Sequence, residues 1–372
     1  MTPSIAFDTP VTELGYTYRL FDASSAPPID ELARVIEQAW SWDYRNKAIL
    51  RFDHSYLLWL MKAESFFGVW VTTEAGEPAG CELALVRTLF SSGRYYRTCY
   101  VTLLSVAPPY RGRGIAQRIL GYLSRAAFEI YRGELIVSAF DRGAAGEPTV
   151  RKSVAQDAGG SAIHVLPPLR LWGCAYDLLE MDRYERLSGA ARIALLPPLR
   201  KLVEAPSRVG RRIGFSPGPK SPVRPSEVES AFAFGFVFDH AIASLYPEGL
   251  GGDSGTLSFD FPDGSHCFFS YHISTLMKEG LSDRKVGQIQ LVFPGTASPL
   301  HLRRALRSVN RALSEAGCLG SMIMDTGALS KWVLLGAGYF PTDRTIHFSI
   351  RGPSRVLGAL SAVKAPFFVD LT

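Results

Sequence analysis

The chain has 372 residues, of which 47% are hydrophobic and 20% charged, and its formal net charge at pH 7 is +5. These fractions indicate a folded protein with a large core rather than a disordered chain, and the length indicates more than one domain. The mild positive charge suits an anionic small-molecule ligand. It is too weak on its own to indicate nucleic-acid binding.

The cysteines, the N-terminus and the histidines exclude several other classes. The five cysteines are widely spaced and form no Cys-x-x-Cys pair, which argues against a disulfide framework and a zinc site. The N-terminus shows no basic stretch followed by an apolar one, and no apolar run approaches the roughly 18 residues of a membrane span. The histidines show no metal-ligand spacing. We therefore expect a reduced, cytoplasmic protein without metal, signal peptide or transmembrane segment.

The first half of the chain predicts an α/β domain over residues 1–182. A strand, two helices, three period-two strands in a meander, a helix and a strand follow one another, and a further helix and two strands complete the domain. In chain order the expected strands are 16–21, 67–73, 81–89, 95–106, 134–140, 162–165 and 174–179, and the expected helices begin near Pro28, Asp53, Gly112 and Pro148.

The most specific stretch is Val-Ala-Pro-Pro-Tyr-Arg-Gly-Arg-Gly-Ile-Ala, residues 106–116. An apolar strand ends at the two prolines, and an apolar-periodic helix begins after the second glycine. Gly112 and Gly114 let the backbone approach a ligand closely, so that N–H groups of the first helical turn point at one anion. Arg111 and Arg113 add positive charge. The stretch therefore predicts a pyrophosphate site at a helix start.

This stretch resembles the coenzyme A loop of the GNAT acyltransferase superfamily, whose core is Gln/Arg-x-x-Gly-x-Gly/Ala. Here the matching residues are Arg111, Gly112, Arg113, Gly114, Ile115 and Ala116, and Val106 to Tyr110 supply the usual preceding context. A dinucleotide fingerprint fits less well because Gln117 stands where its third glycine belongs, and no P-loop Gly-Lys-Ser/Thr follows. The order of elements over the first half is also that of a GNAT domain.

Residues 183–228 form an expected linker. Ten Lys and Arg residues stand there against three Glu and no Asp, and seven prolines interrupt the segment. One interpretation is a partly ordered linker whose apolar residues pack locally. The other is a basic surface for an acidic peptide, an acyl carrier protein or a membrane face.

Residues 229–372 repeat the order of elements of the first half. A helix over 231–245 is followed by strands at 256–261, 265–273 and 286–293, then by a helix from Leu302, a strand at 319–324, a helix at 329–335 and a strand at 345–350. The glycine loop is missing, because Pro294 to Pro299 stand in its place. We therefore expect two tandem GNAT-like domains with a mixed sheet, of which only the first binds coenzyme A.

A tandem chain with one cofactor loop resembles the N-myristoyltransferases, and mycothiol synthases are a second tandem GNAT group. The segment Phe52 to Trp59, its spacing onward to Val106 and an extended tail are similar to the myristoyltransferases, although Gly112-Arg113-Gly114 replaces their usual loop, so myristate specificity is not implied. The resemblance implies that the backbone N–H groups of Leu103 and Leu104 hold the thioester oxygen. It also implies that Val106 pairs with the pantetheine.

The base is less clear from the residues. Many GNAT enzymes carry an acid tyrosine at the position that Ala155 occupies, whereas myristoyltransferases use their terminal carboxylate. This chain ends in an apolar tail, Ala365 to Thr372, which we expect to insert into the fold. We therefore take the Thr372 carboxylate as the catalytic base. The rivals are Glu82, Asp141 and His272.

Together these features predict an acyl-CoA-dependent N-acyltransferase. It would move a medium or long acyl chain from coenzyme A to an amine of a peptide or small molecule, with acyl carrier protein as an alternative donor. Two other functions stay open: an acetyl-CoA-dependent acetyltransferase of a small amine, and a non-catalytic acyl-CoA sensor or scaffold. A nucleic-acid partner is not expected.

Overall fold

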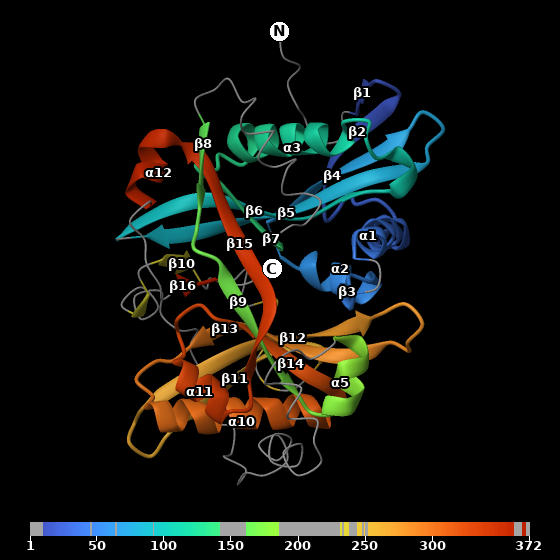
Figure 1. Ribbon diagram of the computed structural model, residues 1–372. Coiled ribbons are helices and arrows are strands. Elements are labelled where there is room, and N and C mark those ends of the chain that lie inside the picture. Colours follow the sequence, from blue (N-terminus) through green and yellow to red (C-terminus); the bar gives the residue numbers. More distant parts are fainter. Residues whose placement is uncertain are drawn as a thin grey trace.

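The computed structural model describes residues 10–44, 47–63, 65–91, 93–141, 161–185, 231–232, 234–237, 244–247, 249, 252–360 and 367–369. Over these residues the strands form one mixed sheet, whose main path runs β1-β2-β4-β5-β6-β7-β15-β9-β14-β13-β12-β11 (Figure 1). The predicted α/β class with a mixed sheet is confirmed. The helix predicted from Pro148 and nearly all of the predicted linker lie outside the described residues.

The first half follows the predicted order, with short strands β1 and β3 added. Asp53 caps α2 as expected, because its carboxylate accepts hydrogen bonds from the backbone N–H groups of Ser55 and Tyr56. The elements are β1 (Val11–Glu13), β2 (Tyr16–Asp22), α1 (Ile29–Asp43), β3 (Ile49–Arg51), α2 (His54–Leu60), β4 (Phe66–Thr73), β5 (Pro78–Ser91), β6 (Arg94–Val106), α3 (Ile115–Arg125), β7 (Leu135–Asp141) and β8 (Ser161–Val165).

Two sequence predictions are wrong. The strand expected at 174–179 lies earlier, as β9 (Leu169–Ala175), because Asp177 caps a helix, α5 (Leu178–Tyr184). The helix expected over 231–245 contains β10 (Phe234–Phe236), which pairs with β5. Its three residues are aromatic or glycine and fully buried, and β-propensity with sheet pairing wins over the helical apolar pattern.

The second half otherwise repeats the order of the first. Its elements are β11 (Ser254–Asp260), β12 (His266–Met277), β13 (Arg284–Phe293), α10 (Pro299–Glu315), β14 (Cys318–Met324), α11 (Lys331–Gly336), β15 (Phe340–Pro353), α12 (Ser354–Leu360) and β16 (Phe367–Phe368).

The two halves exchange strands. β15 of the second half pairs antiparallel with β7 of the first, from Ile346 opposite Asp141 to Arg351 opposite Ile136. In return, β9 pairs with β14. Figure 1 shows β15 beside β8 and β9, crossing together from one half to the other. The domain boundaries expected from the sequence stay a prediction, and the hydrogen-bonded sheet runs through both halves.

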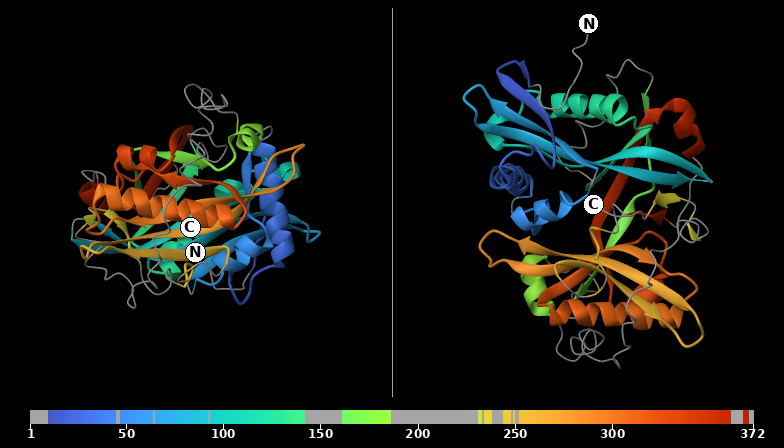
Figure 2. Two further views of the ribbon diagram at one scale, coloured as in Figure 1. Left: turned by 90° about the horizontal axis from the view of Figure 1, so that it is seen from below. Right: turned by 180° about the vertical axis from the view of Figure 1, so that it is seen from behind.

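The layers follow from which face each helix covers. Helix α3 lies on the outer face of the first half, and α10 and α11 lie on the outer face of the second (Figures 1 and 2). Helices α1 and α2 and strand β3 lie between the two halves, where β3 pairs with β12. One apolar core accordingly joins α1 and α2 to Phe268, Leu291 and Phe293 of the second half.

A buried polar network fixes α10 to the sheet. The Asn310 side-chain oxygen accepts hydrogen bonds from the hydroxyls of Tyr176 (3.2 Å), Ser321 (2.9 Å) and Tyr339 (2.6 Å). Its amide nitrogen donates to the carbonyl oxygen of Ala337 at 3.3 Å. Asn310 is fully buried, so the network is shielded from water. Through one side chain it joins α10 to β14, to the segment between β9 and α5 and to the segment between α11 and β15.

Replacing Asn310 by Ala leaves three buried hydroxyls without their acceptor. Each unsatisfied hydroxyl costs about 1–3 kcal/mol, but some of the hydroxyls can form new hydrogen bonds with one another. We therefore expect the free energy of unfolding to fall by roughly 3 kcal/mol. Urea denaturation measures it. Ser308→Ala on the solvent side of the same helix is the control and should change stability by less than about 0.5 kcal/mol. An equal loss in both variants would contradict the role given to the network.

Candidate active site

The loop after β6 has the backbone that its glycines predict. Gly112 and Gly114 adopt φ of 76° and 78°, in the left-handed region that disfavours any side chain. A Cβ added at Gly112 would meet no atom within 4 Å, so this side of the loop is open. Gly114 is the N-cap of α3, and Ile115 and Ala116 begin its first turn. The geometry fits an anion held by backbone N–H groups at a helix start, as coenzyme A requires.

The Arg111 side chain forms hydrogen bonds within the protein, instead of the free positive charge that the sequence suggests. Its guanidinium donates to both carboxylate oxygens of Asp43 (2.5 and 3.2 Å) and to the carbonyl oxygens of Ala39 (2.9 Å) and Val106 (3.1 Å). The side chain therefore fastens the loop to the last turn of α1. The guanidinium charge is paired with the Asp43 carboxylate. A contribution of Arg111 to cofactor binding stays a prediction, and it would have to come from the Arg111 backbone.

Two other arginines lie at the loop. Arg113 donates to the Tyr16 hydroxyl at 2.9 Å and lies over the Tyr110 ring. Arg118, which the sequence reasoning missed, donates to the carbonyl oxygen of Arg113 at 3.4 Å and pairs with Glu13 at 3.5 Å. Its signal was its spacing, since it lies four residues after Gly114 and one helical turn brings its side chain back over the loop.

Strand β6 carries a β-bulge where the sequence places the thioester contacts. Cys81 lies opposite Ser105 and Leu83 opposite Thr102, so β6 has one residue more than β5 between these pairs. Leu103 lies in the bulge and adopts a φ of 57°. The Ser105 hydroxyl donates to the carbonyl oxygen of Leu103 at 2.9 Å and accepts from the indole of Trp40 at 3.2 Å. The bulge is thus fixed by hydrogen bonds on both sides.

Beyond the bulge, β6 separates from its neighbour. Its parallel pairing with β7 ends at Val101 opposite Ser138, although both strands continue. The backbone of β6 after Val101 is therefore no longer paired with β7. The roles given to the backbone N–H groups of Leu103 and Leu104 and to Val106 stay predictions.

A cavity of about 140 Å³ opens where β6 and β7 part, between the two halves of the chain. Thr102 and Leu103 of β6 and Phe140 of β7 line one wall. Aromatic residues of α1, of α2 and of the segment between them also line the cavity: Trp40, Tyr44, Phe52 and Tyr56. The cavity is largely apolar, as acyl and aromatic groups require.

The opposite wall comes from the second half, which repeats the bulge. Gln290 is the extra residue of β13 against β12, and the pairing of β13 with β14 ends at Ile289 opposite Ile323. Gln288 donates to the Ser274 hydroxyl at 2.6 Å and accepts from Gln290 at 3.2 Å. Both copies of the fold therefore turn their separated strands toward one cavity. The second copy supplies amide groups where the first supplies Thr102 and Leu103.

The helix start of the second copy is closed by its own residues. A Cβ at Gly295 would lie 2.1 Å from the carbonyl oxygen of His266, so backbone already occupies that side of the turn. The Ser298 hydroxyl accepts a hydrogen bond from the backbone N–H of His301 at the first turn of α10. These contacts use the space and a donor that an anion would need.

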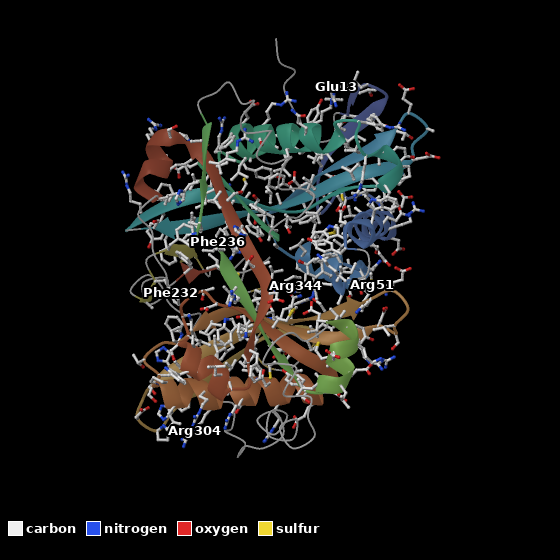
Figure 3. All side chains as sticks on the ribbon, viewed as in Figure 1. Glu13, Arg51, Phe232, Phe236, Arg304 and Arg344 are labelled. Atoms are coloured by element: carbon white, nitrogen blue, oxygen red, sulfur yellow. The ribbon has the colours of Figure 1, made fainter. Side chains whose placement is uncertain are left out.

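Arg344 lines the cavity and joins separate segments of the chain. It pairs with Glu185 at 2.6 Å and donates to the carbonyl oxygen of Ala48. Figure 3 places Arg344 and Arg51 between the two halves, and Arg51 bridges Glu37 and Asp283. Ion pairs therefore join the halves at the edge of the site.

The candidate bases differ in position. Thr372 lies outside the described residues, as do Ala155 and the side chain of Asp141. The tail enters the fold as expected, because Phe367 and Val369 are buried in a core cluster. That cluster also contains Tyr100 and Leu171, which line the cavity. The described residues of the tail therefore share a core with two residues of the cavity wall.

Glu82 and His272 are buried but unsuited to act as bases here. Burial raises the pKa of the Glu82 carboxyl to about 8, yet Glu82 is not among the residues that line the cavity. Burial lowers the pKa of His272 to about 4, so its imidazole is neutral and weakly basic. Its ring stacks on Trp59 with centroids 4.1 Å apart.

The described residues contain no group of three His, Cys, Asp or Glu side chains that could hold a metal ion. All five cysteines are buried free thiols. Over the same part of the chain, no helix is long and apolar enough to cross a membrane.

Comparison with known proteins decides the family of the first half. Residues 30–145 match the model of the acetyltransferase (GNAT) family. This part of the chain is a GNAT domain. The predicted superfamily is confirmed, and with it the predicted enzyme class, a GNAT-type N-acyltransferase. No curated protein sequence matches the chain.

Solved structures extend the likeness beyond the GNAT domain. Saccharomyces cerevisiae N-myristoyltransferase with bound myristoyl-CoA matches over 92% of this chain and 80% of its own, with a TM-score of 0.68 and 12% sequence identity. A second structure of that enzyme, with myristoyl-CoA and inhibitors, matches at 0.68 and 13% identity over 92% and 81%. A Pyrococcus horikoshii protein assigned as an acetyltransferase matches at 0.51 and 12% identity over 99% and 96%. The predicted myristoyltransferase-like tandem fold is confirmed, and acyl carrier protein as donor gains no support.

The Glu82 carboxyl gives a pH-dependent prediction. Its folded pKa of about 8 exceeds the ordinary value of 4.5, so the folded state binds a proton more tightly and loses stability as the pH rises between these values. Glu82→Gln removes that loss. We expect the variant to be more stable than wild type by roughly 5 kcal/mol at pH 9 and equally stable near pH 4.

Chemical denaturation across this pH range measures the difference. Glu74→Gln, on an exposed turn, is the control and should follow wild type at every pH. A Glu82→Gln variant that is less stable at pH 9 would show that the carboxylate has a partner in the fold.

Proposed function

We propose that the protein transfers a medium-chain acyl group from coenzyme A to a primary amine. The single observation that carries the proposal is the cavity at the point where β6 leaves β7, directly before the open glycine loop. The loop fits the pyrophosphate, and the separated strand leads from it to the cavity. The expected cofactor residues, Val106 and 111–116, lie along this path.

The size of the cavity supports a chain shorter than myristoyl. A cavity of roughly 150 Å³ in another protein admits benzene, so about 140 Å³ accommodates an apolar group of about six carbons without movement. Chains longer than this extend beyond the cavity, so we expect a preference for about six to ten carbons. A tetradecanoyl chain has about twice the carbons that this volume accommodates without movement.

In the proposed reaction, backbone N–H groups of β6 stabilise the oxyanion and the C-terminal tail supplies the base. The amine nitrogen attacks the thioester carbonyl carbon, and the backbone N–H groups of Leu103 and Leu104 stabilise the oxyanion. The Thr372 carboxylate takes the proton of the amine, the carbon–sulfur bond breaks, and the thiolate is protonated on release. Three residues beyond the buried Val369 reach at most about 10 Å, so the proposal requires the bound amine to lie within that distance of Val369. Gln288 and Gln290 supply amide groups toward the acceptor.

A second candidate is acetyl transfer to a small amine. The match to the acetyltransferase family model over residues 30–145 favours it. An acetyl group leaves most of the cavity empty, whereas a medium chain fills it. Chain-length preference therefore separates the two candidates.

The first test is retention of acyl-CoA in native mass spectrometry. Incubation with acetyl- to palmitoyl-CoA should retain hexanoyl- to decanoyl-CoA best and myristoyl-CoA at least tenfold less. Retention of acetyl-CoA alone would support the second candidate and refute the first. Retention without thiol release in the presence of any amine tested would identify a non-catalytic binder.

A matched pair of glycine variants tests the loop. Gly112 and Gly93 have the same φ of 76°, and an added Cβ meets nothing within 4 Å at either position. Both alanine variants therefore carry a similar backbone strain of about 1 kcal/mol. We expect Gly112→Ala to weaken coenzyme A binding by at least tenfold and Gly93→Ala, in a distant hairpin turn, to leave it unchanged.

The tail is tested by moving the carboxylate. Adding Gly-Ser after Thr372 should lower kcat by about 10²- to 10⁴-fold while the Kd of coenzyme A stays the same, because only the base is displaced. Thr372→Ala keeps the terminal carboxylate and should keep the activity. Full turnover by the extended chain would exclude the tail as the base, and loss in both variants would point to packing of the tail.

A further inference from the structure

Helix α10 presents a row of arginines on the outer surface of the second half. Its buried residues, among them Leu302, Leu306 and Val309, face the sheet. The opposite side carries Arg304, which is exposed, and three half-buried arginines. Glu315 is the single acid of the helix. The half-buried arginines are Arg303, Arg307 and Arg311.

The neighbouring helix adds a cation and large apolar side chains. In α11, Lys331, Trp332 and Leu335 are exposed, while Val333 and Leu334 are buried. Trp332 is 82% exposed, the highest value among the large hydrophobic residues of the described chain. A tryptophan this exposed costs free energy in water unless something covers it.

The two helices form one surface. The Arg307 guanidinium donates to the carbonyl oxygen of Gly336 at 3.0 Å. A Cβ on Gly336 would lie 2.5 Å from Cδ of Arg303, so the arginine stem packs directly on the end of α11. Leu300, at the start of α10, is 45% exposed on the same side as Arg304, one turn away. We call this surface the α10–α11 patch: Leu300, Arg304, Arg307, Arg311, Lys331, Trp332 and Leu335.

The patch is remote from the candidate active site. Helix α10 lies at the outer edge of the second half, and Figure 3 labels Arg304 there (Figures 1 and 3). The view from below shows α10 at the near side of the molecule (Figure 2). The cavity lies on the other face of the same sheet, toward α1 and α2. Contacts at the patch therefore leave the cavity accessible.

We propose that the α10–α11 patch binds the surface of a bilayer that contains anionic phospholipid. The cations are complementary to the phosphate headgroups, and Trp332 with the two leucines suits the boundary between headgroups and acyl chains. Arginine and lysine side chains reach the headgroups while their stems lie against the apolar layer. An acidic protein or nucleic acid would satisfy the charges alone, and Trp332, Leu300 and Leu335 favour the bilayer over both.

Vesicle sedimentation of the full chain tests the proposal. We expect binding to phosphatidylcholine vesicles that contain 30% phosphatidylglycerol, little binding to pure phosphatidylcholine, and release at 0.5 M salt because the charges are screened. Arg304→Glu combined with Lys331→Glu should lower binding at least tenfold. Trp332→Ala should also lower it at least fivefold, without a change of charge.

Matched controls carry the same changes elsewhere. Arg94→Glu with Arg355→Glu reverses two exposed charges outside the patch, and Tyr95→Ala removes an aromatic residue that is 52% exposed. Both controls should bind vesicles like wild type. Acylation of a soluble amine should be unchanged in every variant, so loss of the proposed activity and loss of membrane binding are distinguishable.

Quenching of tryptophan fluorescence by bromolipids gives a second measurement. It should fall when Trp332 is replaced by Phe, because only a residue at the bilayer is close to the bromines. The proposal is overturned if wild type ignores anionic vesicles, or if the patch variants bind them like wild type. It is also overturned if an acidic protein or an oligonucleotide binds in their place and Trp332→Ala has no effect.

Discussion

The pairing of β15 with β7, and of β9 with β14, is the constraint on which the rest of the molecule depends. Each half contributes one strand to the sheet of the other half, so neither half has a complete sheet of its own. Asp141 and Ile346, which pair in this exchange, are more than 200 residues apart in sequence. Contacts of this separation slow folding, and they require nearly the whole chain to be present before the first half can complete its sheet.

The exchange also explains why one cavity serves both copies of the fold. In each half a β-bulge releases one strand from its parallel neighbour, at Leu103 and at Gln290. The exchanged strands hold these two openings opposite each other, and α1 and β3 fill part of the space between them. The duplicated fold has diverged at this point, since one copy keeps an open glycine loop and the other fills its turn with the His266 backbone.

Much of the fold followed from the sequence, because period-two strands and capped helices are local signals. The glycine loop, the Asp53 cap and the repeat of elements are read from neighbouring residues. The strand exchange cannot be read in this way, because no residue pattern in β7 or β15 indicates which edge of the sheet each strand joins. The short β10 was missed for the same reason, since its aromatic residues pack against a strand more than 140 residues away.

The site was predictable in part. Residues 106–116 identify the loop by composition and spacing, whereas the use of the Arg111 side chain depends on Asp43, 68 residues away. Gln288 and Gln290 have no motif around them, and only the fold brings them to the cavity. The cavity therefore had to be seen in the structure, while the cofactor loop did not.

The Arg111 contacts have a consequence for binding kinetics. A glycine-rich loop that is ordered only by its ligand spends part of the binding free energy on that ordering. Here four hydrogen bonds to Asp43, Ala39 and Val106 order the loop in the free protein. The cofactor thus meets a preorganised surface. Association then needs no slow rearrangement of the loop, and differences in affinity between donors lie mainly in their dissociation rates.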